Sequence, residues 1–104
     1  MGQPSIIELD GRIDHVTSPG IEAKIGSVLD ESPSALILDF TRVTFLSSIG
    51  LRVLLMAAKR CRKQNAQIAL HSVSPRIVEL FGVSGMTSFF PIYPSREAAL
   101  AIFA

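Results

Sequence analysis

Two adjacent serines, Ser47 and Ser48, stand where an apolar stretch gives way to a helical pattern, in the segment TFLSSIGLRVLL. A serine before a helix accepts a hydrogen bond from a backbone amide two or three residues further on, and Ser47 is placed to do this with Ile49 or Gly50. Ser48 would then occupy the first helical position, beside amides that carry partial positive charge. A phosphate group is tolerated there. The serines therefore have two interpretations, a helix cap or a phosphorylation site, and the local chemistry by itself favours the cap.

The other residue types that carry chemistry do not form a catalytic or metal-binding pattern. No G-x-S-x-G motif occurs, and neither His15 nor His71 is in a pattern that pairs it with a serine. One cysteine, Cys61, and two distant histidines do not supply a set of metal ligands. Neither a glycine-rich dinucleotide motif nor a P-loop lysine motif occurs. The sequence predicts a protein that is not an enzyme and needs no metal and no cofactor of its own.

Charge balance and apolar run lengths exclude several kinds of partner. Ten basic and nine acidic residues give a formal net charge of +1, so no strong overall field attracts nucleic acid or anionic lipid. The basic run KRCRK contains no aromatic residue and lies near the end of a predicted helix, where the helix dipole favours cations. It is interpreted as a solvent-exposed face. Charges break every apolar run well before the roughly 20 residues that a transmembrane helix needs, which predicts no membrane insertion.

Length and cysteine content indicate the organisation and the compartment. A chain of 104 residues that is 48% hydrophobic is long enough for one domain with its own core, and we expect a single domain over residues 1–104. Cys61 has no second cysteine with which to form an internal disulfide. Because the N-terminus also lacks a secretory apolar region, the sequence predicts a cytoplasmic protein.

Four segments have the pattern of β-strands. SIIEL, Ser5 to Leu9, is a short apolar run that the following DG would end in a turn. ALILDF, Ala35 to Phe40, is almost continuously apolar, which is typical of a strand near the centre of a sheet, and TRVTFL would connect it to the next helix. QIALHSV is the expected third strand. SFFPIY is the candidate fourth, at an edge, because Pro91 has no amide hydrogen for the ladder.

Helices are predicted between and after these strands. Apolar residues at spacings of three and four, together with capping residues, place them at Thr17 or Ser18 to Asp30, Gly50 to Lys63, Ser74 to Gly82, and Ser95 onward. Strands that alternate with helices of this length predict an α/β domain with a largely parallel sheet and helices packed against it.

Three segments resemble a known family, and together they cover nearly the whole chain. LILDFTRVTFLSSIGLRVLLMAAKRC resembles the central strand, loop and helix of STAS domains, the family of sulfate-transporter and anti-sigma-factor-antagonist domains. LDGRIDHVTS and SPRIVELFGVSGMTSFFPIYPSREAAL are similar to the parts of that family before and after it. The resemblance implies a mixed, mostly parallel sheet of four to five strands with about four helices. It also implies that the family's first strand is short or absent here, which would leave a sheet edge open.

The same resemblance implies a phosphorylation site. In bacterial anti-sigma factor antagonists the loop commonly reads Asp-Ser-Ser-Gly or Asp-Ser-Thr-Gly, and the serine after the aspartate is phosphorylated. Here the aspartate position falls on Ser47 and the phosphorylated position on Ser48, with Ser47 as the alternative site. Asp14 matches an acidic position beside that site, although a turn cap is an equally good interpretation of it. The residues implied to bind the partner are Asp14, His15, Ser47, Ser48, Ile49, Gly50 and Arg52.

The implied function is that of an anti-sigma factor antagonist. Such a protein binds an anti-sigma factor that is also a serine kinase and so releases a sigma factor. Phosphate on Ser48 would end the contact, and a PP2C-type phosphatase would restore it. ATP and magnesium would belong to the kinase, not to this chain.

Two other functions stay open at this point. A transport-associated STAS domain, either the soluble subunit of a lipid-transporting ABC system or part of an anion transporter, remains an alternative because Ser47 replaces the aspartate and Ile49 is bulkier than the usual alanine. A scaffold partner in a stress-signalling assembly is the third interpretation.

Overall fold

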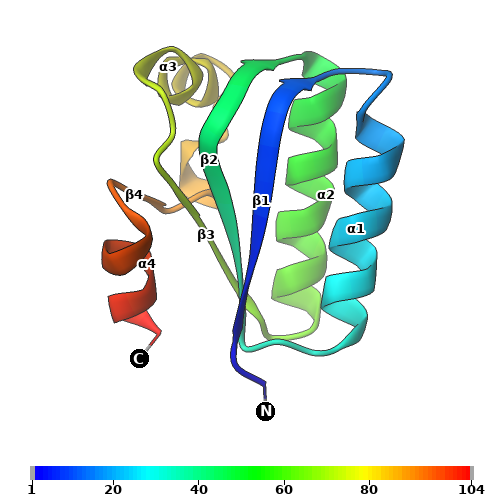
Figure 1. Ribbon diagram of the computed structural model, residues 1–104, viewed down its shortest axis with the longest axis vertical. Coiled ribbons are helices and arrows are strands. Elements are labelled where there is room, and N and C mark those ends of the chain that lie inside the picture. The colour runs from blue at the N-terminus through cyan, green and yellow to red at the C-terminus, as the bar shows by residue number, and fades with distance from the viewer. Residues whose placement is uncertain (1, 104) are drawn as a thin grey trace.

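A parallel β-sheet forms the centre of the computed structural model, which describes residues 2–103 (Figure 1). The strands follow one another across the sheet in the order β1-β2-β3-β4, and each neighbouring pair is parallel. Their bounds are Pro4–Ile13 for β1, Ala35–Leu46 for β2, Gln67–His71 for β3 and Ile92–Tyr93 for β4. Within the described residues β2 and β3 are the interior strands, which confirms the prediction for ALILDF.

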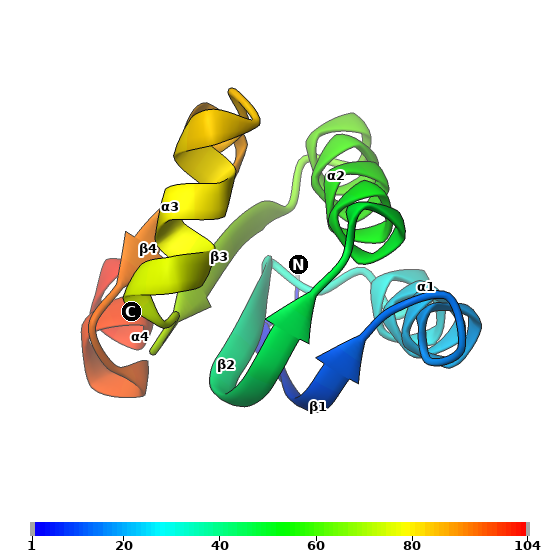
Figure 2. The ribbon, with the colours of Figure 1, turned by 90° about the horizontal axis from the view of Figure 1, so that it is seen from above.

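Helices lie on both faces of the sheet. They are α1 (Ser18–Asp30), α2 (Ser48–Lys63), α3 (Pro75–Val83) and α4 (Arg96–Ile102), with a 3-10 turn, η1, at Thr87–Phe89. Viewed from above, α1 and α2 lie together on one face, whereas α4 packs beside β3 and β4 on the side away from them (Figure 2). The predicted α/β fold is thereby confirmed, with four strands and four α-helices in residues 2–103.

The main hydrophobic core fills the space between the sheet and helices α1, α2 and α3. Leu38 of β2, Leu54 of α2 and Phe81 of α3 are all fully buried in it. The ring centroids of Phe81 and Phe90 are 5.1 Å apart. Each buried side chain of this size contributes on the order of 2 kcal/mol to folding. Cys61 is part of the same core, and burial raises the pKa of its thiol to about 11, which makes it an unreactive thiol.

β1 and β2 are longer than their apolar runs predicted. β1 does not turn at DG, because Gly11 adopts a φ of 68° and stays in the ladder, and TRVTFL is strand rather than connection. Register shifts between Glu8 and Asp10 and between Gly11 and Arg12 each place one extra residue of β2 opposite β1. Side chains that reach the core therefore come at spacings of two and then three along β2: Leu36, Leu38, Phe40, Val43 and Leu46. Because the apolar residues of its second half do not alternate with a period of two, the sequence did not predict that part of β2 as a strand.

The C-terminal third departs from the prediction in two places. α3 continues through Gly82, and the left-handed residue that follows it is Gly85, with a φ of 71°. η1 takes up the first part of SFFPIY, so β4 is only Ile92–Tyr93, at the edge beside β3. Pro91 still takes part in the pairing as an acceptor, since its carbonyl receives the Leu70 amide at 2.9 Å.

Candidate functional site

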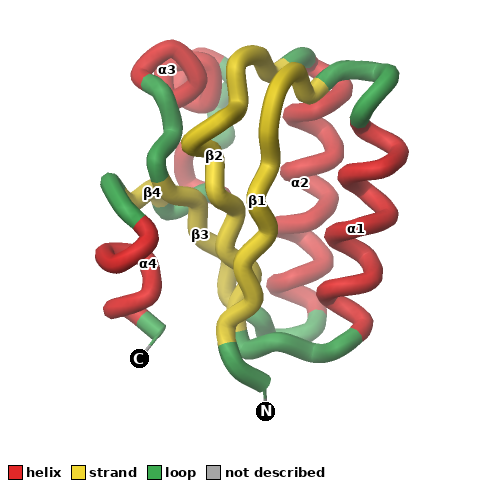
Figure 3. The backbone as a smooth tube through the Cα atoms, in the orientation of Figure 1, coloured by secondary structure: helices red, strands yellow, loops and turns green. Residues whose placement is uncertain are grey.

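The carboxyl ends of β1 and β2 bring two loops together at one end of the molecule (Figure 3). Ile13 and Leu46 form the last pair between the strands, and the amide of Ser47 donates to the carbonyl of Ile13 at 2.9 Å. Asp14 follows Ile13 directly. The turn that contains Asp14 therefore adjoins the start of α2, although the two are far apart in the sequence.

The two serines at the start of α2 have different environments. Ser47 is the N-cap, since its Oγ accepts a hydrogen bond from the amide of Gly50 at 3.1 Å, as predicted. Ser48 is the first residue of the helix and is exposed, and its hydroxyl makes no hydrogen bond within residues 2–103. The amides of Ser48 and Ile49 precede the first intrahelical hydrogen bond and point out of the helix end. An exposed hydroxyl thus lies beside two amides that lack helical partners.

Gly50 lets α2 approach the end of β1. A Cβ atom at this position would lie 2.6 Å from Cγ2 of Ile13 and 2.8 Å from its carbonyl oxygen. Gly50 is itself buried. Its role in the structure is therefore close packing, which holds Ser48 next to the Asp14 turn.

Asp14 caps its own turn, the second of the two interpretations that the sequence left open. Its Oδ1 accepts hydrogen bonds from the amides of Val16 at 3.0 Å and Thr17 at 3.2 Å. The hydrogen bond from Thr17 lowers the pKa of Asp14, and those from Val16 and Arg12 act in the same direction. The carboxylate is therefore charged throughout the physiological range, and its Oδ2 lies 3.4 Å from Nε of Arg12.

The other predicted partner-binding residues, His15, Ile49 and Arg52, are exposed. The side chain of Ile49 is 49% exposed. No hydrogen bond or ion pair engages the side chain of His15 or Arg52 within residues 2–103. The structure thus joins Asp14 and Ser47 through the backbone of Ile13 and leaves these three side chains turned to solvent.

Sequence reasoning missed two residues at this end of the molecule, Arg12 and Phe45. They are register partners on β1 and β2, and the guanidinium of Arg12 lies 4.2 Å from the centroid of the Phe45 ring. Phe45 is 40% exposed and Val16 is 72% exposed, so the two segments that meet at the start of α2 each carry an exposed apolar side chain. Only the strand register could have revealed the pair, and the bulges of β2 hide that register in the sequence.

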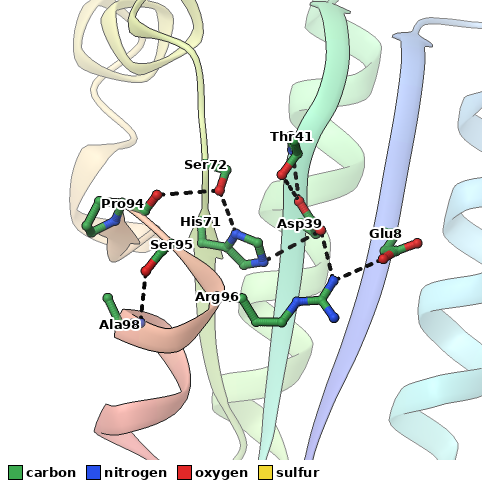
Figure 4. A network of polar contacts seen from close by, with 9 residues as sticks. All are labelled: Glu8, Asp39, Thr41, His71, Ser72, Pro94, Ser95, Arg96 and Ala98. Carbon is green, nitrogen blue, oxygen red and sulfur yellow. Dashed lines mark hydrogen bonds and ion pairs between the residues drawn. The ribbon is translucent and has the colours of Figure 1, made fainter.

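A second polar cluster, also missed, lies on the face of the sheet that carries α4 (Figure 4). Nη2 of Arg96 donates at 3.0 Å to Glu8 of β1 and at 3.0 Å to Asp39 of β2. Hydrogen bonds to Glu8 and Asp39 raise the pKa of Arg96. Burial alone would raise the pKa of Asp39, but hydrogen bonds from Thr41 and Arg96 outweigh it and lower that pKa. The buried His71 lies beside Asp39, with Nε2 3.8 Å from its Oδ2.

In this second cluster Arg96 ties α4 to β1 and β2. Asp39 and His71 are 8% and 2% exposed, and Nδ1 of His71 lies 2.8 Å from the Ser72 hydroxyl. Neither in this cluster nor in the rest of residues 2–103 is a group of three or more His, Cys, Asp or Glu side chains placed to hold a metal ion. None of the described helices combines the length and apolar composition that crossing a bilayer requires.

The sequence profile of the STAS domain matches residues 2–99. The chain belongs to the STAS domain family. Among curated relatives, BtrV of Bordetella bronchiseptica, provisionally named as an anti-sigma factor antagonist, is 36% identical over 95 residues, which cover 91% of this chain and 82% of BtrV. The anti-sigma-F factor antagonist RsfB of Mycobacterium tuberculosis is 31% identical over 81 residues. That match covers 76% of this STAS chain and only 66% of RsfB.

Solved structures agree on the STAS fold. An anti-sigma factor antagonist from Mycobacterium paratuberculosis superposes with a TM-score of 0.86 and 32% identity, over 96% of this chain and 85% of the other. A sulfate transporter family protein from Wolinella succinogenes superposes with a TM-score of 0.81 and 24% identity, over 95% and 83% of the two chains. The fold alone therefore does not separate antagonists from transport-associated STAS domains.

Proposed function

We propose that this STAS domain is an anti-sigma factor antagonist whose contact with an anti-sigma factor is switched by phosphorylation of Ser48. The observation that carries the proposal is the division of labour between the two serines. Ser47 supplies the cap, whereas the Ser48 hydroxyl is exposed and has no hydrogen bond within the described residues. The antagonist names of the relatives that are more than 30% identical support the same function.

Ser48 is a better acceptor of phosphate than Ser47 because modification there leaves the helix cap intact. A phosphate on Ser47 would replace the hydroxyl that receives the Gly50 amide, in a half-buried position against β1. A phosphate on Ser48 would lie at the positive end of a 16-residue helix, where the free amides of Ser48 and Ile49 stabilise negative charge. The switch would then change the surface without unfolding the domain.

The surface that would contact the anti-sigma factor is formed by the loop after β1 and the first turn of α2. Its apolar part is Ile49, Val16 and Phe45, and its charged part is Arg12, Asp14 and Arg52. Phosphoserine adds about two negative charges, and removing water from a phosphate on Ser48 would cost free energy when the partner binds. The phosphate would also repel acidic groups of the partner. The anti-sigma factor would supply the kinase activity, a PP2C-type phosphatase would reverse it, and the exchange would take place in the cytoplasm. The chain itself would act as a binding module.

One observation favours the second candidate, a transport-associated STAS domain. Ser47 stands where the antagonists commonly have an aspartate, so this chain has no carboxylate directly before Ser48. The nearest acid across the loop, Asp14, is already engaged by its own turn. A transport-associated domain would co-purify with a membrane transporter and would remain unphosphorylated.

The proposal is tested by incubating the protein with ATP, magnesium and each candidate anti-sigma kinase of the same genome, followed by intact-mass measurement. We expect one phosphate on the wild type and on Ser47→Ala, and none on Ser48→Ala. Ser27→Ala, which removes an exposed serine of α1, is the matched control and should be modified like the wild type. Phosphate that persists on Ser48→Ala, or a wild type that no kinase modifies, would refute the switch.

A further inference from the structure

The charge of the chain is distributed very unevenly, with an excess of positive charge on α2. This helix carries five basic residues and no acidic one. The rest of the chain, with five basic and nine acidic residues, has a formal charge of −4. A nearly neutral protein therefore presents one strongly basic helix.

Two of the five cations are engaged within the molecule. Arg60 pairs with Asp30 of α1 and donates to the carbonyl of Gly26. Arg62 lies with its guanidinium 5.6 Å from the ring centroid of Phe89. The other three, Arg52, Lys59 and Lys63, are exposed and have no ion pair within residues 2–103.

These three residues lie on one side of α2. Together with Met56 they follow spacings of four, three and four, which places all four side chains within about 60° of the helix circumference. We call Arg52, Met56, Lys59 and Lys63 the basic stripe. Met56, in its middle, is 53% exposed, and Ile49 adjoins its N-terminal end. With Ile49 the stripe is about 20 Å long, and it begins beside Ser48.

The internal electrostatics of the helix do not explain this arrangement. The helix dipole favours Lys63 in the last turn, but its effect falls off within the terminal turns and so does not account for Arg52 or Lys59. Lys59 and Lys63, four residues apart, also repel each other. No acidic residue of α2 offsets these effects. The stripe therefore has no acidic partner within α2, and a negatively charged surface of a partner protein would supply one.

We propose that the basic stripe of α2 binds an acidic surface of the anti-sigma factor, extending the contact from Ser48 along the helix. Carboxylates of the partner pair with Arg52, Lys59 and Lys63, and an apolar side chain of the partner covers Met56. A groove of about 230 Å³ between α1 and α2, to which Val53 and Met56 contribute, lies beside the stripe and receives that side chain. This inference rests on the proposed function and names the chemistry of its partner.

The stripe also gives the Ser48 switch a second effect. Ser48 and Arg52 are four residues apart and so lie on the same side of the helix. A phosphate on Ser48 lies within reach of the Arg52 guanidinium and forms a charge-assisted hydrogen bond with it. Phosphorylation thus withdraws one of the three cations from the partner in addition to placing charge at the helix end.

The test uses the anti-sigma factor that phosphorylates the wild type, with dissociation constants measured by calorimetry at low and at physiological ionic strength. The double variant Lys59→Glu/Lys63→Glu should bind at least about tenfold more weakly and lose most of its dependence on salt. The control Lys24→Glu/Arg42→Glu makes the same change in net charge at two exposed sites outside the stripe. It should bind within about twofold of the wild type. Circular dichroism and thermal unfolding verify that both variants fold, and Lys59→Gln/Lys63→Gln should show an intermediate loss.

Equal affinity of the stripe variant and the wild type would overturn this inference and leave the proposed function standing. A wild type that binds none of the candidate anti-sigma factors would overturn both. Vesicles of phosphatidylserine and phosphatidylcholine provide a further arm. Binding of vesicles by the wild type but not by the stripe variant, with unchanged affinity for the anti-sigma factor, would assign the stripe to lipid and overturn the inference.

Discussion

The cluster around Asp39 and the start of α2 are both polar regions built on the same two strands, but their polar groups are satisfied to different degrees. In the first, Arg96 joins Glu8 to Asp39, and Thr41 donates to the same carboxylate. In the second, the hydroxyl of Ser48 and the first amides of α2 have no partner in residues 2–103. One atom of the first cluster, Nε2 of His71, is nevertheless buried without a hydrogen-bond partner. A cluster whose charged groups pair with one another holds the fold together, whereas exposed polar groups without a partner have capacity for a ligand or a modification.

The largest effect on stability is expected from breaking the cluster around Asp39. Asp39→Ala removes the acceptor of the Thr41 amide and hydroxyl and one of the two acceptors of Arg96, and should lower the free energy of unfolding by about 3 kcal/mol. Urea unfolding measures this loss. The control Asp30→Ala removes an exposed ion pair with Arg60 and should change stability by less than about 1 kcal/mol. A similar cost for both variants would show that the Asp39 cluster is not special.

The next largest effect on stability is expected from the packing that positions the start of α2. Gly50→Ala places a methyl group against the carbonyl of Ile13 and should destabilise the domain by about 2 kcal/mol, with loss of Ser48 phosphorylation. Thermal unfolding and intact mass measure the two consequences. Gly26 lies in the middle of α1, and a Cβ atom there would come no closer than 3.6 Å to another group, Nη1 of Arg60. Gly26→Ala should therefore leave the free energy of unfolding unchanged or raise it. A stable Gly50→Ala that is still phosphorylated would contradict the packing argument.

At the start of α2, the two serines should contribute differently to the free energy of unfolding. Ser47→Ala removes the helix cap and should lower the free energy of unfolding by about 1 kcal/mol. Ser48→Ala removes an exposed hydroxyl without a partner, so its effect should stay within about 0.5 kcal/mol. Chemical unfolding of the two variants side by side decides this. Equal losses would mean that both hydroxyls serve the fold.

The smallest effect is expected from titrating the Asp14 turn. Its pKa is lowered in the folded state, so its contribution to stability is complete above the unfolded pKa of about 3.9 and disappears as the pH falls further through the folded value. Below about pH 4, the free energy of unfolding of Asp14→Asn should therefore change less with pH than that of the wild type. If the free energy of unfolding depends on pH in the same way for both proteins in that range, the hydrogen bonds of the turn are not the cause of the acid sensitivity.

The sequence predicted those features that depend on local patterns. The caps at Ser47, Ser74 and Ser95, the first helix and the central position of ALILDF follow from spacing and from the chemistry of single residues, and the structure confirms them. Features that depend on pairing were not predictable. The interaction of Arg12 with Phe45 and the Asp39 cluster join segments distant in the sequence. The bulges of β2 disguise the register that pairs Arg12 with Phe45, and no local pattern places Arg96 beside Glu8 and Asp39.

Each extra residue in the second half of β2 lengthens that strand without turning its later side chains to the other face. Deleting Thr41 or Arg42 would remove one of the two bulges and restore a spacing of two residues between Phe40 and Val43, whose side chains would still face the core. The strand would straighten, however, and the first turn of α2 would move relative to the Asp14 turn. Such a deletion would therefore alter the direction in which Ser48 points while keeping the buried side chains of β2 in the core.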